Sequence, residues 1–193
     1  MSRGVERAWT ALRWRLRLTV VLWWGRPAPV LACVAAWLQA QPDHPHALAT
    51  QAHWLAQTKD LHAAAHVLRR LRVLQPQVAA HAFNLGFVLQ GLARWSEAQS
   101  TFEAAIDLNP LLDRAWYGLG VVRIELGDLS GAEQALRRNT ELQPMSPLGW
   151  YQLAHLHHER GEFAPAQDLL RHLRSFEPRV ARQLEREWAA VSA

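Results

Sequence analysis

The chain has 193 residues, half of them hydrophobic, and its single cysteine excludes both an intrachain disulfide framework and a cysteine-based zinc site. The formal net charge is +4 at pH 7, but residues 1–26 carry six arginines against one glutamate, so the rest of the chain is close to neutral. This local distribution argues against a uniformly basic surface for nucleic acid. It suggests instead an acidic partner or anionic lipid headgroups near the N-terminus.

The first 44 residues are basic and rich in tryptophan, and we predict them to be helical. Apolar residues recur every three or four positions from Val5 to Trp23, and most arginines lie away from that stripe, as in an amphipathic helix. Gly25 and the prolines that follow Arg26 interrupt the apolar stretch. The candidates for contact with a membrane or a partner are Trp9, Arg13, Arg17, Trp23 and Trp24.

Three interpretations of residues 1–44 remain open. The segment is a degenerate copy of the repeated unit described next, since Gly25 stands at the turn place of that unit and Pro42 keeps its register. Alternatively, residues 1–40 contact or enter a membrane surface, because they combine arginines with tryptophans. The third interpretation is an export signal, since residues 30–33 faintly resemble a lipoprotein cleavage site.

Prolines recur at one constant interval along the chain, at Pro42, Pro76, Pro110, Pro144 and Pro178. Because proline cannot continue a helix and restricts the residue before it, this spacing divides the chain into repeated units of equal length. We assign four complete units between residues 45 and 180. Their bounds are 45–78, 79–112, 113–146 and 147–180.

Apolar residues within each unit predict two helices. Large residues at the fourth, seventh and eleventh places form one stripe, and a second stripe runs from the seventeenth to the thirtieth place. Small residues at the eighth and twentieth places let the two helices approach closely, and Gly127 and Gly161 are expected to stop the first helix. Each pair leaves an apolar face that only a neighbouring pair can bury. The sequence therefore predicts an all-α solenoid of helix-turn-helix units, because no window has the alternation typical of a strand.

Two consecutive units share a set of characteristic residues, which are Leu85, Gly86, Trp95, Ala98, Phe102, Ala105 and Pro110 in one unit, and Trp116, Leu119, Gly120, Gly127, Ala132 and Pro144 in the next. With these residues the two units closely resemble tetratricopeptide repeats (TPR), and their neighbours resemble them less strongly. The resemblance implies a right-handed α-solenoid. Two departures stand at the eleventh place, where Arg123 and His157 replace the usual aromatic residue and suggest locally irregular packing.

Residues 181–193 are predicted to form a capping helix. Leu184 and Trp188 lie on one helical face, and Arg182 and Arg186 lie away from it. A terminal repeat needs such a helix, with one apolar and one polar face.

In TPR proteins the first helices of successive repeats line a concave groove that holds a peptide or helix, and the resemblance implies the same here. We expect Phe83, Phe87, Tyr117 and Tyr151 to be exposed at places that the core does not need. The competing explanation is that another segment of this chain covers them. We expect an apolar or amphipathic peptide, because most of the basic clamp that some TPR proteins use for an acidic tail is missing. The groove candidates are His53, Phe83, Asn84, Phe87, Gln90, Arg114, Tyr117, Val121, Ile124, Tyr151, Gln152, His155 and His158.

We therefore predict a protein-interaction scaffold, adaptor or assembly factor and no enzyme, since the chain has no Gly-rich phosphate loop, HExxH or GxSxG motif. The ten histidines are interpreted as surface residues, so no metal or cofactor is expected. Alternatives are self-assembly into homo-oligomers, a membrane-surface scaffold that docks through the N-terminal segment, and an enzyme accessory that delivers metal through the histidines. We expect no nucleic-acid partner and a cytoplasmic location, with membrane association as the alternative.

Overall fold

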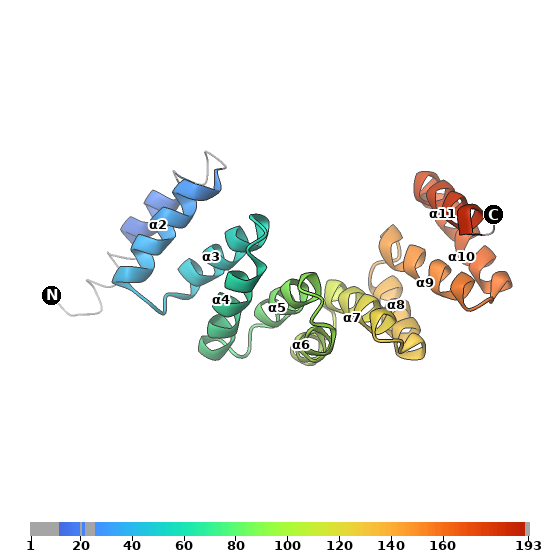
Figure 1. The fold of residues 1–193 in the computed structure, drawn as a ribbon, viewed down its shortest axis with the longest axis horizontal. Helices are drawn as coiled ribbons and strands as arrows, with labels where there is room; N and C mark the ends of the chain where they lie inside the picture. The colour runs from blue at the N-terminus through green and yellow to red at the C-terminus, as the bar shows by residue number, and fades with distance from the viewer. Residues whose placement is uncertain (1–11, 20, 22–25, 192–193) are drawn as a thin grey trace. The chain divides into compact units, whose positions relative to one another are not determined.

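The fold is seen in a computed structural model that describes residues 12–19, 21 and 26–191. All regular secondary structure in these residues is α-helical, so the predicted all-α class is confirmed (Figure 1). The chain divides into two compact units, Met1–Leu92 (unit 1) and Ala93–Ala193 (unit 2), which are described separately.

Helix pairs follow the period of the prolines closely. The first helices of four pairs have 13 residues each, and the second helices have 14. Every helix begins one full period after its equivalent in the preceding pair. The first helices are α3 (Pro45–Gln57), α5 (Ala79–Gly91), α7 (Asp113–Glu125) and α9 (Pro147–Glu159). The second helices are α4 (Leu61–Leu74), α6 (Trp95–Leu108), α8 (Leu129–Leu142) and α10 (Phe163–Phe176).

The N-terminal region contains helix within residues 12–19, followed by α2 (Pro27–Ala40). α2 has 14 residues and begins one full period before α4, so it occupies the register of a second helix. None of the described helices is both long and apolar enough to cross a membrane.

The periodic prolines lie between helix pairs, as predicted, but not all in the same way. Pro42, Pro76, Pro110 and Pro144 stand in the short connections. The fifth, Pro178, is instead the first residue of α11 (Pro178–Val191), which therefore starts before the predicted residue 181. Proline suits the first position of a helix because the amide proton that it lacks would have no partner there.

The turn inside each complete pair uses a residue with positive φ at the fifteenth place. Gly127 has φ 79° and Gly161 has φ 73°, which confirms both as stops of the first helix. The same place holds Lys59 with φ 66° and Ala93 with φ 54°, where a side chain makes the left-handed conformation costly.

Glycine also permits the close approach of the two helices of a pair. A Cβ atom added to Gly120 of α7 would lie 2.6 Å from Cγ of Leu136 in α8, which is shorter than any ordinary contact. Another repeated contact fixes the start of the first helix, since the indole of Trp116 donates a 2.8 Å hydrogen bond to the carbonyl of Pro110. Trp150 makes the same bond to Pro144, also at 2.8 Å.

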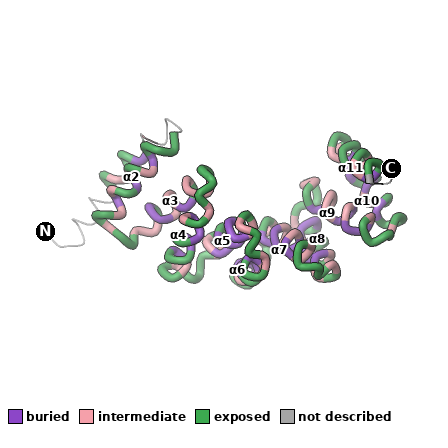
Figure 2. The backbone as a smooth tube through the Cα atoms, viewed as in Figure 1, coloured by how far each residue is buried: buried purple, intermediate pink, exposed green. Residues whose placement is uncertain are grey.

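Unit 1 has a hydrophobic core at its N-terminal end. Trp37 of α2 is completely buried, and Leu18 in the helix at 12–19 is buried beside it. Ala47 brings α3 into the same cluster, and Cys33 of α2 packs at its edge. Figure 2 shows the buried stretches of α2 in purple and its exposed stretches in green. The described residues before α3 are thus packed against the first complete pair.

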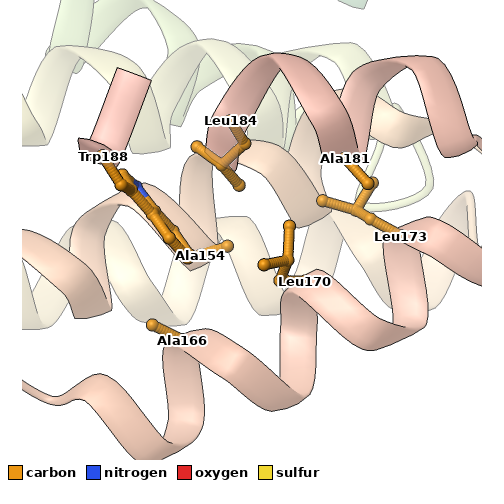
Figure 3. Close-up of a cluster of buried hydrophobic side chains, with 7 residues drawn as sticks. All are labelled: Ala154, Ala166, Leu170, Leu173, Ala181, Leu184 and Trp188. Carbon is orange, nitrogen blue, oxygen red and sulfur yellow. The ribbon is translucent and has the colours of Figure 1, made fainter. Parts of the chain in front are cut away.

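Unit 2 has a corresponding core at its C-terminal end (Figure 3). Leu184 and Trp188 of α11 point toward Leu170 of α10 and Ala154 of α9, and all four are buried. The arginines at 179, 182 and 186 are exposed, so α11 has the apolar and polar faces that the sequence predicts.

Candidate protein-binding surface

The candidate residues of unit 1 lie on α3 and α5. Phe87 is 57% exposed, although it is a large aromatic residue on a helix that is otherwise mostly buried. Asn84 stands one turn before it and is exposed, and Gln90 is half-buried. His53 is exposed on α3, where its ring contacts Trp54.

The expectation that Phe83 is exposed is wrong, because its side chain is only 7% exposed. α5 buries residues around most of its circumference, from Ala82 to Leu89, and a helix that is apolar on nearly all sides is covered on nearly all sides. Phe83 therefore belongs to the buried residues of α5, and Phe87 is the aromatic side chain that α5 presents to solvent.

The candidate residues of unit 2 lie on α7 and α9, which are in contact with each other. Arg114 near the start of α7 is exposed. The others are half-buried, so part of each side chain is exposed to solvent. They are Tyr117, Val121, Ile124, Tyr151, Gln152, His155 and His158.

Two of these residues are engaged by α11. The hydroxyl of Tyr151 donates a short hydrogen bond to the carboxylate of Glu187, and the ring of His158 stacks on Trp188 at a centroid distance of 4.4 Å. Tyr151 is therefore partly covered by another segment of the same chain and is not the free aromatic residue that the sequence suggests. Sequence reasoning did not identify Glu187, which shares this surface.

The contact between Tyr151 and Glu187 changes the acidity of both groups. Burial, followed by the hydrogen bond to the Glu187 carboxylate, raises the pKa of Tyr151 to about 12. The same hydrogen bond, followed by one from Gln183 at 2.9 Å, lowers the pKa of Glu187. Both shifts favour a neutral tyrosine that donates to an ionised carboxylate.

The two departures at the eleventh place make polar contacts in place of aromatic packing. Arg123 on α7 donates to the carbonyl of Gly131 at 3.1 Å and lies 3.7 Å from the carboxylate of Asp128. The equivalent residue in the next pair, His157, is 4% exposed and hydrogen-bonds through Nδ1 to Glu162. Asp128 and Glu162 occupy the same place in consecutive units, just before the second helix. Each departure therefore ties the first helix of a pair to the start of the second.

Glu133 on α8 joins this network from the preceding pair. Its carboxylate accepts from Arg160 at 2.9 Å and from Arg137 at 2.8 Å, and it lies 3.7 Å from Nε2 of His157. Burial by itself raises the pKa of Glu133, but the hydrogen bonds and charges of these basic groups lower it overall. The network thus links α8, α9 and the turn that leads into α10.

No metal-binding arrangement of histidines with acidic residues or cysteine is found in the described ranges 12–19, 21 and 26–191. No group of three or more such side chains there is arranged to hold a metal ion. His62 and His66 are exposed on α4, and His155 lies 3.4 Å from the carboxylate of Glu159.

The candidates near the N-terminus are only partly described. Trp9, Trp23 and Trp24 lie outside the described residues. Arg13 and Arg17 are exposed, and the guanidinium of Arg17 lies 5.2 Å from the ring centroid of Trp14.

Comparison with known proteins places this arrangement in a class. Residues 83–147 match the model of the tetratricopeptide repeat family, so this part of the chain is made of tetratricopeptide repeats. The fold is the all-α solenoid of that class, as the sequence predicted. Repeat proteins of this kind are generally scaffolds for protein–protein interaction, so a general protein-binding role follows from the class.

Solved structures of several proteins share the fold over nearly the whole chain. MamA 41-end from Desulfovibrio magneticus RS-1 has a TM-score of 0.80 and 21% identity, with 92% of this chain and 96% of that chain covered. YrrB, described as a TPR protein with an unusual peptide-binding site, has a TM-score of 0.78 and 16% identity, covering 95% and 96%. PilF of Pseudomonas aeruginosa has a TM-score of 0.75 and 19% identity, covering 96% and 90%. No curated protein sequence matches the chain.

Proposed function

We propose that this protein is a scaffold or adaptor that binds a segment of a partner protein on the first helices of its repeats, and that its role is binding and not catalysis. The observation that carries the proposal is Phe87, a large apolar side chain that is 57% exposed at a groove place of α5. An aromatic residue beside exposed or half-buried amides, here Asn84 and Gln90, is typical of surfaces that recognise proteins.

The surface of unit 2 supports the same proposal. Tyr117, Val121 and Ile124 follow one another along α7 at helical spacing and are all half-buried. Together with the half-buried candidates of α9, they offer a partner a mixed apolar and polar surface. We propose that the bound segment is an apolar or amphipathic peptide or helix, since this chemistry matches the surface.

We further propose that residues 11–44 form a degenerate fifth pair. The support is the register of α2, together with the core that joins Leu18 and Trp37 to Ala47 of α3. Packing of a neighbouring pair is what a repeat contributes to its array. The capping role of α11 is likewise a proposal, supported by its apolar inner face and its polar outer face.

The proposed binding surface is tested with peptides selected from a displayed library against the full chain. Phe87→Ala and, separately, Tyr117→Ala are expected to weaken the selected peptides at least tenfold, because an aromatic anchor contributes about 2 kcal/mol or more. The matched control is Val73→Ala, which removes an exposed apolar side chain from a second helix, since Val73 is 81% exposed on α4. Peptides that tolerate both groove substitutions but not the control would overturn the proposal.

Self-assembly is the competing function. We also propose a cytoplasmic location, with membrane association as the alternative. Light scattering on the full chain separates self-assembly from capture of another protein. A homo-oligomer that dissociates when Phe87 or Tyr117 is replaced would assign the surface to a second copy of this chain.

A further inference from the structure

We propose that the helix at residues 12–19 and the neighbouring outer face of α2 form a contact surface for an anionic lipid bilayer. This surface differs from the proposed protein-binding surface on the first helices from α3 onward. The argument rests on the faces of the helix at 12–19, on its charges, and on the composition of the outer face of α2.

The helix at residues 12–19 is apolar on two opposite sides. Its inner side carries Leu18, which is 1% exposed in the N-terminal core, and Trp14, which packs against that core. Its outer side carries Leu12, 47% exposed, and Leu16, 62% exposed. At about 100° per residue, Leu12 and Leu16 lie roughly 40° apart, and Leu18 lies about 200° beyond Leu16. A helix that only packs on a core needs one apolar side, and the core of the described residues does not use the second one.

Arginines flank the outer leucines. Arg13 and Arg15 are exposed, and on the same helical geometry they lie on opposite sides of the Leu12–Leu16 stripe, within about 100° of it. Arginine side chains in such positions extend their charged ends to lipid headgroups while their methylenes lie along the apolar surface. Basic residues flanking an exposed apolar stripe are the arrangement of helices that lie in a membrane interface.

The charge of the region has one sign. The sequence contains no aspartate or glutamate between Glu6 and Asp43, and Arg26 adds another exposed positive charge just before α2. Attraction to a negatively charged surface is therefore not offset by a local acid.

The exposed residues of α2 would not oppose such a contact. They are two prolines, four alanines and one glutamine, so they carry no charge. The second helices α4, α8 and α10 in contrast expose charged residues such as Arg70, Arg137 and Arg171. An uncharged face can approach a headgroup layer without losing the hydration of ionised groups.

Lipid is favoured over the other anionic partners by the place of the leucines. In a contact with nucleic acid or an acidic protein driven by charge, arginines would occupy the centre of the surface and leucines would contribute little. Here Leu12 and Leu16 are central and the arginines are peripheral, so the contact needs an apolar layer beneath an anionic one.

The test is co-sedimentation of the full chain with phosphatidylcholine vesicles prepared with and without phosphatidylglycerol. We expect binding only when phosphatidylglycerol is present, and weaker binding as salt is raised. Replacing Arg13, Arg15 and Arg26 by Gln is expected to weaken binding roughly a hundredfold. Replacing Leu12 and Leu16 by Ser is expected to weaken it at least tenfold with no change of net charge.

Matched controls separate this surface from general properties of the chain. Arg179, Arg182 and Arg186 of α11 are also exposed, and their replacement by Gln removes the same charge elsewhere. Leu111 and Met145 are 69% and 70% exposed, and their replacement by Ser removes comparable apolar surface. Both controls are expected to bind like the unmodified chain, with circular dichroism showing equal helicity throughout.

Three outcomes would overturn the proposal. One is no sedimentation with phosphatidylglycerol vesicles at low salt. Another is equal loss of binding in the two arginine variants, which would reflect net charge alone. The last is binding that survives replacement of both leucines, which would assign the basic surface to an acidic macromolecule.

Discussion

The two terminal regions of the described chain both pack a helix against a hydrophobic core, but they differ in what that helix exposes to solvent. At the C-terminal end, α11 covers Leu170 with Leu184 and Trp188 and turns exposed arginines to solvent. At the N-terminal end, the helix at 12–19 also buries an inner side, but its outer side exposes Leu12 and Leu16. One end is thus amphipathic in the ordinary sense, and the other is apolar on both sides.

The difference shows that burial alone does not explain the N-terminal sequence. A segment that served only to cover α3 would need no outer leucines, because α11 covers its own neighbours with a single apolar side. The composition of the two ends therefore points to packing alone at α11 and to packing combined with an external contact at residues 12–19.

The largest expected effect tests whether both ends are equally well packed. Trp37→Ala should lower the free energy of unfolding by about 3–5 kcal/mol and Leu184→Ala by about 2–5 kcal/mol, because both side chains are completely buried. Urea titration followed by circular dichroism measures both. A cost below about 1 kcal/mol for Trp37→Ala would mean that the N-terminal core contributes little, and the comparison would fail.

The turns offer a second and smaller contrast. Gly161 in the C-terminal pair has φ 73° with no atom near an added Cβ, so Gly161→Ala should cost about 1 kcal/mol through backbone strain alone. Lys59 adopts φ 66° in the first complete pair, so Lys59→Gly should stabilise unit 1 by a few tenths of a kcal/mol after the entropy cost of glycine. Thermal unfolding of both variants gives the signs, and a loss of stability in Lys59→Gly would contradict the explanation.

A third test concerns the contact that ties α11 to α9. Because the pKa of Tyr151 is raised from 10.0 to about 12, this contact stabilises the fold fully below pH 10 and loses its effect as the pH rises toward 12. Tyr151→Phe should remove the late phase of tyrosinate absorbance, which is measurable because the chain has only two tyrosines. Its cost at pH 7 is expected to be about 1 kcal/mol.

Acid should weaken the contact between Tyr151 and Glu187 as well, because it protonates the Glu187 carboxylate. The lowered pKa of Glu187 gives stability that is present above its ordinary value of 4.5 and is lost as the pH falls through the shifted value. In Tyr151→Phe the carboxylate should titrate closer to 4.5, as measured by carbon NMR. An unchanged Glu187 titration would show that the hydrogen bond does not form in solution.

The smallest effect on stability is expected for the exposed leucines of the helix at 12–19, which have no counterpart among the described residues of α11. Replacing Leu12 and Leu16 by Ser should change the free energy of unfolding by less than about 0.5 kcal/mol each, because both are well exposed. A cost of more than about 2 kcal/mol would mean that these leucines are core residues, and their external role would be excluded.

Most of the fold could be predicted from the sequence because the helix pairs repeat at one constant interval along the chain. The prolines mark the connections, and the glycines at 127 and 161 mark turns whose φ only glycine adopts freely. The turns at Lys59 and Ala93 carry no such signal, since neither residue type favours the left-handed conformation that it adopts there. The earlier start of α11 was missed because Pro178 begins a helix where the other periodic prolines precede one.

Less of the candidate site was predictable. The exposure of Phe87 follows from its place, but the burial of Phe83 depends on how completely the surroundings cover α5. The hydrogen bond between Tyr151 and Glu187 joins residues 36 positions apart. The spacing of residues within a helix pair does not predict a contact between helices of different pairs. The sequence identified His157 as a departure from the repeat pattern, but it did not indicate that Glu162 forms a hydrogen bond with the His157 ring.

The lone thiol of Cys33 gives this protein a built-in reporter. The side chain sits at the edge of the N-terminal core, and burial there raises its pKa, so little of it is thiolate near neutral pH. Alkylating reagents should accordingly react slowly while α2 stays docked and faster whenever it detaches. Since no other cysteine competes, labelling rates would follow the opening of that single helix against the rest of its unit without any engineered probe.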